Sequence, residues 1–432
     1  MARRKTPKVS RPKGLRRGVE LFKDLLIVLL TCSAVFLAWQ TPMANHLRGW
    51  VVPPPSPASE PAVRSEEALT PYAIRIRNSL GSYAVSYDGP TLTRTFQRFS
   101  GLLGEALASD EIPERITTRQ WQALLETPGF YCALRGSLPL SVLPQWLGME
   151  SSISGEAQAL VLSWDGSRVW LGWRSGDGFF RVRTQVDFAG DLSPLVESFS
   201  PNGGAFAYTL SEDSAFEALD PYVLITPTAP QPKNFTAASP DLTGDAETLT
   251  KLLNALGFLS GADAAYETPG GLTVTENGDR LQVTSGGKIT YRAGEELRFP
   301  VSGPSAGQGA QAAWELLCRV AEPFENTPAY VLTGVEATEN GWTVTFEARL
   351  EGIPVTTGAS GWCARFTVDG RKITEFTLIL RTYAPTGEVT PLPDHRLAAA
   401  ALRSIPGSDG TLVLCYPDNL SSTLTAGWMT GE

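Results

Sequence analysis

An uncharged apolar run of 23 residues, preceded by a strongly basic segment, constrains this chain more than any other feature. Residues 25–47 read LLIVLLTCSAVFLAWQTPMANHL and contain no Asp, Glu, Lys or Arg. As a helix this run would be about 34 Å long, enough to cross a hydrocarbon core of roughly 30 Å. Residues 1–24 carry nine Lys/Arg and two acidic residues, a balance that favours the cytoplasmic side. We therefore expect a single-pass cell-membrane protein with its N-terminus inside and its C-terminal ectodomain outside.

A cleaved signal peptide is the alternative interpretation of the same residues. The densest apolar part, Leu25–Trp39, has 15 residues, which is within the range of a signal-peptide core. The basic segment is unusually long, however, and Pro42-Met43-Ala44 matches a small-residue cleavage site poorly. Cys32 lies inside the run, where no lipid-attachment site is expected. The sequence favours an uncleaved anchor.

Small and hydroxyl residues in the anchor form a candidate helix–helix interface. Such residues let transmembrane helices approach closely. The candidate positions are Thr31, Ser33, Ala34 and Ala38, beside Cys32. The alternative is that this face contacts only lipid.

The net charge of the ectodomain limits the classes of partner that it can bind. The whole chain carries −9, while residues 1–24 contribute +7, so the remainder carries −16. Nucleic-acid binding needs clustered Lys/Arg, so the acidic ectodomain argues against it. The basic tail either lies on the anionic inner leaflet or serves only as a topology signal.

Proline-rich stretches and hydrophobic patterns divide the chain. We expect the following segments: cytoplasmic tail 1–24, transmembrane helix 25–47, Pro-rich stalk 48–67, first α+β unit 68–226, linker 227–240, second helix-plus-meander unit 241–301 and third helix-plus-meander unit 302–432. The linker, PTAPQPKNFTAASP from residue 227, has few residues that could pack, so we expect it to be exposed. We also expect residues 241–432 to fold without the first unit.

Within these units, periodicity predicts helices at 92–107, near 118–125, at 245–256 and at 308–321. Strands are predicted between turn signals such as Asp165-Gly166 and Asn340-Gly341. Thr343–Leu350 alternates apolar and polar residues, as an antiparallel strand with one buried face does. The fold class is therefore α+β, an ectodomain of antiparallel meanders each preceded by a helix.

No catalytic, metal-binding or cofactor-binding constellation emerges from the sequence. Residues 303–307, GPSAG, match G-x-S-x-G, but no parallel sheet is predicted around them, and Ser305 is more simply a helix N-cap. The two histidines, His46 and His395, are far apart. We therefore expect no enzyme activity, no metal and no cofactor.

Five cysteines leave the disulfide state open. Cys32 lies in the apolar run, and the other four are scattered without a C-x-x-C motif: Cys132, Cys318, Cys363 and Cys415. They could form two disulfides in three connectivities. Cys318 falls on the apolar stripe of a predicted helix, which is typical of a core residue.

Several stretches together resemble the YycH/YycI family of membrane-anchored regulators of the WalK sensor kinase. They are the anchor end LAWQ at 37–40, LLNALGF at 252–258 with the strand GGLTV at 270–274, VTFE at 344–347 with GIPV at 352–355, FTVDG at 366–370, and LVLCY at 412–416. The resemblance implies an extracytoplasmic α+β protein without catalytic residues, whose transmembrane helix contacts the kinase helices.

Two function classes follow. The first is a non-enzymatic regulator of a two-component sensor histidine kinase, acting through the anchor and the ectodomain, with a paralogous membrane regulator as a further partner. The second is a binding module for cell-wall polymer or peptide without a signalling role. Its surface would be exposed aromatics of the first unit: Trp164, Trp170 and Trp173.

Overall fold

The computed structural model describes residues 65–432 except 211–212, 406–409 and 431–432. The predicted tail, anchor and helix-interface residues Thr31, Ser33, Ala34 and Ala38 lie outside the described residues, so they stay predictions. No helix among the described residues is both long enough and apolar enough to cross a bilayer. The predicted α+β class is confirmed, with strands that pair mostly antiparallel.

The first half is built on a seven-stranded antiparallel sheet in the order β2-β1-β4-β5-β6-β7-β3. Its strands are β1 (Ala73–Arg77), β2 (Ser82–Ser86), β3 (Glu114–Ile116), β4 (Gly129–Pro139), β5 (Glu156–Trp164), β6 (Val169–Ser175) and β7 (Gly178–Arg183). Neighbouring residues of one strand alternate between the sheet's two faces. Phe130 accordingly packs in the same core as helix α3 (Gly89–Leu107), while Tyr131 packs with helix α4 (Thr118–Glu126).

Both helices form where the sequence predicts them. The buried face of α3 contains Leu92, Phe96, Phe99 and Leu103, at helical spacing. Asp88 caps its start by accepting a hydrogen bond from Thr91 N. Helix α4 begins with a capping box between Thr117 and Gln120, which satisfies backbone N–H groups that have no partner inside the helix.

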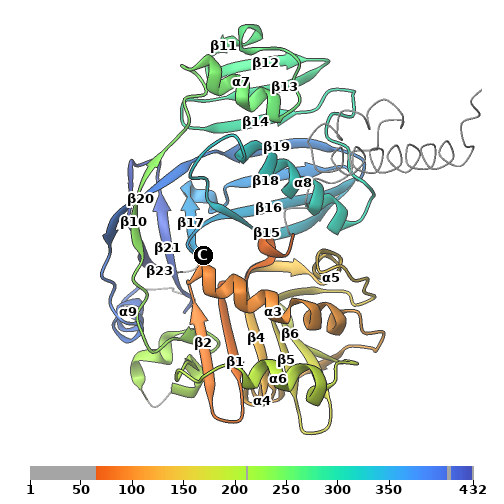
Figure 1. Cartoon of the computed structure of the whole chain (residues 1–432), viewed down its shortest axis with the longest axis vertical. Helices are drawn as coiled ribbons and strands as arrows, with labels where there is room; N and C mark the ends of the chain where they lie inside the picture. The colour runs from red at the N-terminus through yellow and green to blue at the C-terminus, as the bar shows by residue number, and fades with distance from the viewer. Residues whose placement is uncertain (1–64, 211–212, 406–409, 431–432) are drawn as a thin grey trace, which may run out of the picture. The chain divides into compact units, whose positions relative to one another are not determined.

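The second half is built on an eleven-stranded sheet, in which the path β11-β12-β13-β14-β19-β18-β16-β17-β21-β23 is completed by β15 against β16. Its strands are β11 (Tyr266–Thr268), β12 (Gly271–Glu276), β13 (Asp279–Val283), β14 (Lys288–Arg292), β15 (Ala329–Thr338), β16 (Gly341–Leu350), β17 (Ile353–Thr357), β18 (Ala364–Val368), β19 (Ile373–Ile379), β21 (Leu412–Asp418) and β23 (Gly427–Thr430). Helices α7 (Ala246–Ala255) and α8 (Ala306–Ala321) accompany the sheet (Figure 1). The two predicted meanders share this one sheet, because β14 pairs with β19. Strands β17 and β21 pair in parallel, unlike the rest.

The predicted linker, residues 227–240, differs from the expectation of an exposed connection. Its second part forms β10 (Lys233–Ala238), the middle strand between β20 (Thr382–Val389) and β22 (Thr423–Leu424). Phe235 is buried, and its ring meets that of Tyr416 edge-on with the ring centroids 5.5 Å apart. The prolines end at Pro232 and resume at Pro240, so the seven residues between them keep the N–H groups that a central strand needs.

Side chains also join the two sheets. Arg135 on β4 pairs with Glu347 on β16 at 3.3 Å, and Arg349 donates to Thr70 O at 2.7 Å. Trp146 Nε1 donates to Gly307 O at the start of α8. Independent folding of 241–432 stays a prediction, and these contacts argue against it, because the fragment would lose partners of buried charges.

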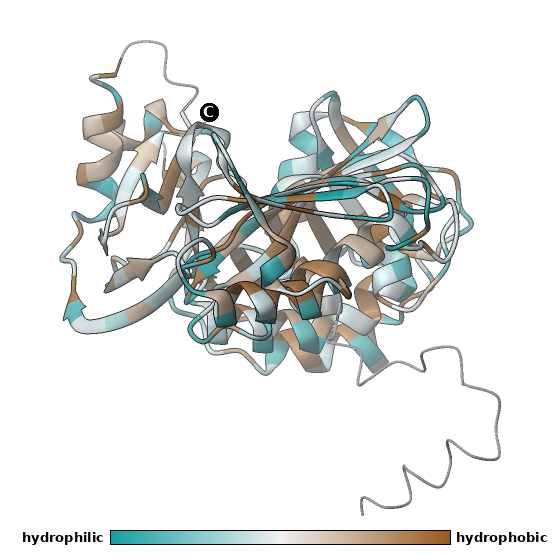
Figure 2. Ribbon diagram, turned by 90° about the horizontal axis from the view of Figure 1, so that it is seen from above, coloured by the Kyte–Doolittle hydropathy of each residue, from teal (hydrophilic) through white to brown (hydrophobic). Residues whose placement is uncertain are grey.

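Smaller elements complete the described chain. They are the helices α5 (Val142–Trp146), α6 (Ser193–Glu197) and α9 (His395–Leu402), the short helices η1 (Ser65–Leu69), η2 (Phe188–Leu192), η3 (Ala207–Leu210), η4 (Ser214–Ala218), η5 (Ala262–Ala264) and η6 (Gly358–Ser360), and the strand pair β8 (Ala205–Phe206) and β9 (Leu224–Ile225). Figure 2 shows hydrophilic and hydrophobic residues on different sides of the helices, as amphipathic helices require.

Candidate functional site

A cleft of about 530 Å³ lies where the first sheet meets the second. One wall is the end of β2 and the start of α3, residues 83–88 with Pro90 and Thr91. The opposite wall is the proline-rich segment 226–232, and the rim includes Lys233, Glu351 and Ile353. This volume is in the range of clefts that hold ligands, which often lie between structural units.

The cleft follows the outer edge of β2, which is an end strand of its sheet. Asn202 closes the first part of this edge. Its side chain accepts from Ala84 N at 2.9 Å and donates to Ala84 O at 2.7 Å, while its own N–H donates to Ser82 O at 2.9 Å. Asn202 thus takes the place of a neighbouring strand for these two residues.

The edge is open at Ser86. Tyr87 N donates to Tyr72 O on the β1 side, and consecutive residues of a strand turn their backbone groups to opposite edges. Ser86 therefore directs its N–H and C=O outward, like Ala84, but neither group has a hydrogen-bond partner among the described residues. Its Oγ atom is buried and also has no partner there. One complete backbone donor–acceptor pair is left available beside the cleft.

A close crossing of two glycines fixes this wall against the second sheet. Gly89 N donates to Glu351 O at 2.7 Å. A Cβ atom on Gly352, whose φ is +93°, would lie 2.3 Å from Gly89 N, so a larger residue would push the start of α3 away from the β16–β17 turn. The start of α3 and the β16–β17 turn are therefore held together next to the cleft.

The cleft is lined mainly by uncharged residues. Its residues include no histidine or cysteine. Its closest charged pair, Lys233 with Glu351, is about half exposed on both sides, so solvent screens it. The opposite wall contributes Pro227, Pro230 and Pro232, which have no backbone N–H to compete for a bound acceptor.

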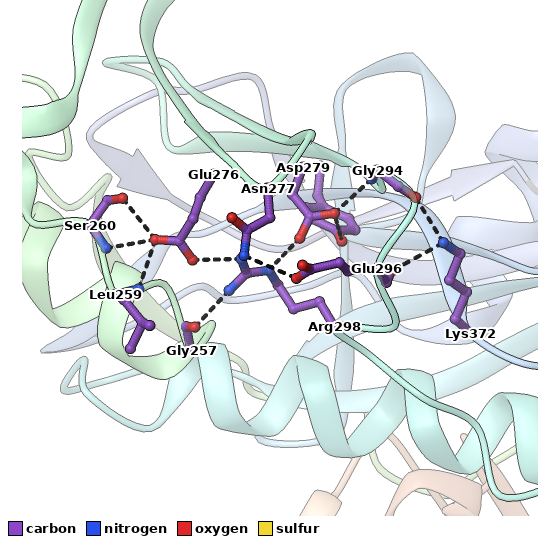
Figure 3. Close-up of polar contacts among 11 residues, drawn as sticks. Gly257, Leu259, Ser260, Glu276, Asn277, Asp279, Gly294, Glu296, Arg298 and Lys372 are labelled. Atoms are coloured by element: carbon purple, nitrogen blue, oxygen red, sulfur yellow. Dashed lines mark hydrogen bonds and ion pairs between the residues drawn. The ribbon is translucent and has the colours of Figure 1, made fainter.

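A cluster of buried and partly buried ion pairs lies elsewhere, around Arg298 (Figure 3). Arg298 donates to the fully buried Asp279 at 2.5 Å, to Glu276 at 2.6 Å and to Gly257 O at 2.6 Å. Asp279 also accepts from Tyr291 OH at 2.9 Å and from Gly294 N at 2.7 Å. The guanidinium lies 4.1 Å from the centre of the Phe258 ring.

This Arg298 cluster is structural. Burial alone would raise the pKa of Glu276, but hydrogen bonds from Ser260 and Arg298 outweigh it and lower that pKa to about 2. Glu276 is therefore ionised at neutral pH and has no proton to donate. Its second oxygen accepts from Leu259 N and from the N–H and Oγ of Ser260. The cluster ties the loop after α7 to the β12–β13 hairpin and the segment before α8.

Ser305 is a helix N-cap, as predicted. It caps α8 in a capping box with Gln308, and its Oγ also meets Gln145 Oε1 at 3.2 Å. His395 is buried on α9, where its ring packs on Trp428 at 4.9 Å. Asp394 caps α9 by accepting from Leu397 N. None of these contacts links Ser305 with His395.

The predicted exposed aromatic surface is partly wrong. Trp173 is only 2% exposed, because its position on β6 faces the α3 side of the core. Trp164 stacks on Phe188 with ring centroids 4.5 Å apart. Trp170 is half-buried, donates to Asp165 at 2.7 Å and lies under the Arg181 guanidinium at 4.0 Å. Its partners come from this chain, so the three rings do not form one open platform.

The four described cysteines are all free. Burial raises the pKa of both the Cys132 and the Cys318 thiol to about 12, which keeps them protonated and unreactive. No group of His, Cys, Asp and Glu among the described residues has the arrangement of a metal site.

The cleft could not be located from the sequence. The prolines in residues 226–232 led to the prediction of a linker, and nothing in the sequence indicated that this segment forms the wall of a cleft. Asn202 lies 118 residues from the strand it closes, so no local pattern connects the two.

Comparison with known proteins shows the fold. No family model matches the chain, and no curated protein matches its sequence. Among solved structures, it is similar to the crystal structure of YycH from Bacillus subtilis, with a TM-score of 0.52 and 12% sequence identity. The match covers 85% of this chain and 95% of that chain. The chain therefore has a YycH-like fold, and the resemblance inferred from the sequence is confirmed at that level.

Proposed function

We propose that this chain is a membrane-anchored, non-enzymatic regulator of a two-component sensor histidine kinase. The observation that carries the proposal is the YycH-like fold over 85% of the chain, since the resemblance to regulators of the WalK kinase implies that role. The apolar run 25–47 supports a membrane location, with the basic tail inside and residues 48–432 outside.

Regulation would work by differential binding. A regulator shifts a kinase between two conformations only by as much as it binds one better than the other. The anchor contributes through the small-residue face at Thr31, Ser33, Ala34 and Ala38, and the ectodomain contributes a second contact outside the membrane. A paralogous membrane regulator is a further proposed partner.

Co-purification with the kinase tests the proposal. Full-length chain is co-expressed with a histidine kinase encoded beside it, solubilised in mild detergent and captured by a tag on the kinase. We expect recovery of the chain, and we expect Ala34→Leu or Ser33→Leu to reduce it at unchanged expression. Phe36→Leu, about half a turn from Ala34, is the matched control and should leave recovery intact. Equal recovery of Ala34→Leu would remove this helix face from the mechanism.

Location and the alternative function need separate measurements. Protease added to wall-stripped intact cells should digest the ectodomain and spare an N-terminal tag; a protected ectodomain would contradict the proposed topology. Purified wall material should not retain the full-length chain. Strong retention, together with no transcriptional response when the gene is deleted, would favour the polymer-binding module instead.

A further inference from the structure

The cleft beside Ser86 has the features of a strand-binding site. Asn202 closes the part of the β2 edge at Ala84. Beyond it, Ser86 presents a backbone N–H and a backbone C=O that have no partner among the described residues. An extended polypeptide whose residue lies opposite Ser86 would satisfy both, as in strand addition to a sheet edge.

The shape of the cleft favours the same occupant. Its lining comes from two stretches of chain, residues 83–88 with Pro90 and Thr91 on one side and residues 226–232 on the other. Three of the seven residues of the second wall are prolines, which cannot donate hydrogen bonds to an inserted chain, so this wall offers fewer backbone donors than a regular strand edge. The Gly89–Gly352 crossing keeps the two sheets in place on one side of the cleft, which lowers the ordering cost of binding.

We infer that this cleft binds an extended segment of a partner protein, which adds to the edge of β2 through backbone hydrogen bonds to Ser86. Recognition is mainly of backbone, because the three charged side chains of the cleft already have partners: Lys233 pairs with Glu351, and Asp88 caps α3. The inference does not depend on the proposed kinase partner, because it rests on the unpaired backbone groups of Ser86 beside the cleft.

A peptide selection with structure-based variants tests the inference. A displayed library of random twelve-residue peptides is panned against the full-length chain in detergent, and the affinity of the best peptide is measured. Thr228→Arg places a long side chain at an exposed position of the cleft wall. It should weaken binding at least tenfold. Thr338→Arg, at an exposed position on β15 away from the cleft, is the matched control and should not change it.

Backbone pairing is tested by methylating each peptide nitrogen in turn. Because only one side of an added strand faces β2, one position should lose about tenfold in affinity while its two neighbours change little. The Ser86 amide should also exchange with solvent more slowly in the complex.

Three results would overturn the inference. They are failure to enrich any peptide, equal binding to Thr228→Arg, and a methylation profile without a single sensitive position. Self-association of the full-length chain that Thr228→Arg abolishes would assign the cleft to a second copy and also reject the partner segment. Since kinase co-purification is measured separately, either conclusion can fail without the other.

Discussion

Mild acid should destabilise the fold through His395. Burial lowers the pKa of His395 to about 4, while the adjacent Asp394 acts in the opposite direction. The ring is 4% exposed and packs on Trp428. The nearby charges already pair with each other, Arg396 with Asp213 and Arg403 with Glu217. In the unfolded chain the imidazole titrates near pH 6.5.

The sign and size of the change in stability follow from the folded and unfolded pKa values of His395. Above pH 6.5 the ring is neutral in both states and contributes no pH dependence. As the pH falls toward 4, the unfolded chain takes up the proton first, so the folded state loses stability. The difference between the folded and unfolded pKa values of His395, about 4 and 6.5, corresponds to a total loss of about 3 kcal/mol in the free energy of unfolding. About 2 kcal/mol of this loss falls between pH 7.5 and pH 5.

Urea unfolding of the full-length chain at pH 7.5 and pH 5 measures this loss. His395→Phe keeps a flat ring against Trp428 and cannot be protonated, so its stability should fall about 2 kcal/mol less over the same interval. Leu397→Phe, at an exposed position on the same helix, is the matched control and should behave like the parent. If His395→Phe and the parent lose the same amount, the buried imidazole is not the acid-sensitive group.

Further predictions concern stability and thiol chemistry. Asp279→Ala leaves the Arg298 guanidinium without its buried partner and should lower the free energy of unfolding by about 3 kcal/mol, whereas Glu375→Ala, at a solvent-exposed ion pair, should change it by less than about 1 kcal/mol in the same urea titration. Equal losses in the free energy of unfolding for the two variants would show that burial of the Asp279–Arg298 pair does not determine its contribution. Ser305→Ala should cost about 1 kcal/mol through the lost cap of α8, and a shift above about 3 kcal/mol in thermal unfolding would show another role. Cys132 should react with a thiol reagent at pH 8 only after denaturant is added, and fast labelling of the native chain would contradict its burial.

Local patterns were sufficient for most individual elements. The spacing of Leu92, Phe96 and Phe99 predicted α3. The alternation in 343–350 predicted the strand β16, but the prediction of a single buried face was wrong, because Glu347 and Arg349 on the polar face are buried as well. Helix α9 was missed because its alanine-rich sequence has a short apolar stripe. Strand β10 was missed for a different reason: it lies between prolines, which predicted a linker.

Long-range arrangement was not accessible from the sequence. Nothing in residues 241–301 indicates that β14 pairs with β19, which joins two predicted units into one sheet. The cleft depends on the same kind of information, since its two walls come from segments more than 100 residues apart. Periodicity reports which face of an element is buried, but not which distant element covers that face.

The contact between Tyr87 and Leu414 has a consequence for the order in which the protein can fold. Leu414 N donates to the Tyr87 hydroxyl at 3.2 Å across 327 residues of sequence. At a synthesis rate of about 5–20 residues per second, roughly 15–65 s pass between the two residues. Strand β17 ends at Thr357 and β21 begins at Leu412, so β17 lacks its parallel neighbour for the last 55 of these residues, roughly 3–11 s. An uncovered strand edge is prone to aggregation during that interval. A premature stop before Leu412 would make this state permanent, so quality-control proteases should remove such shortened products.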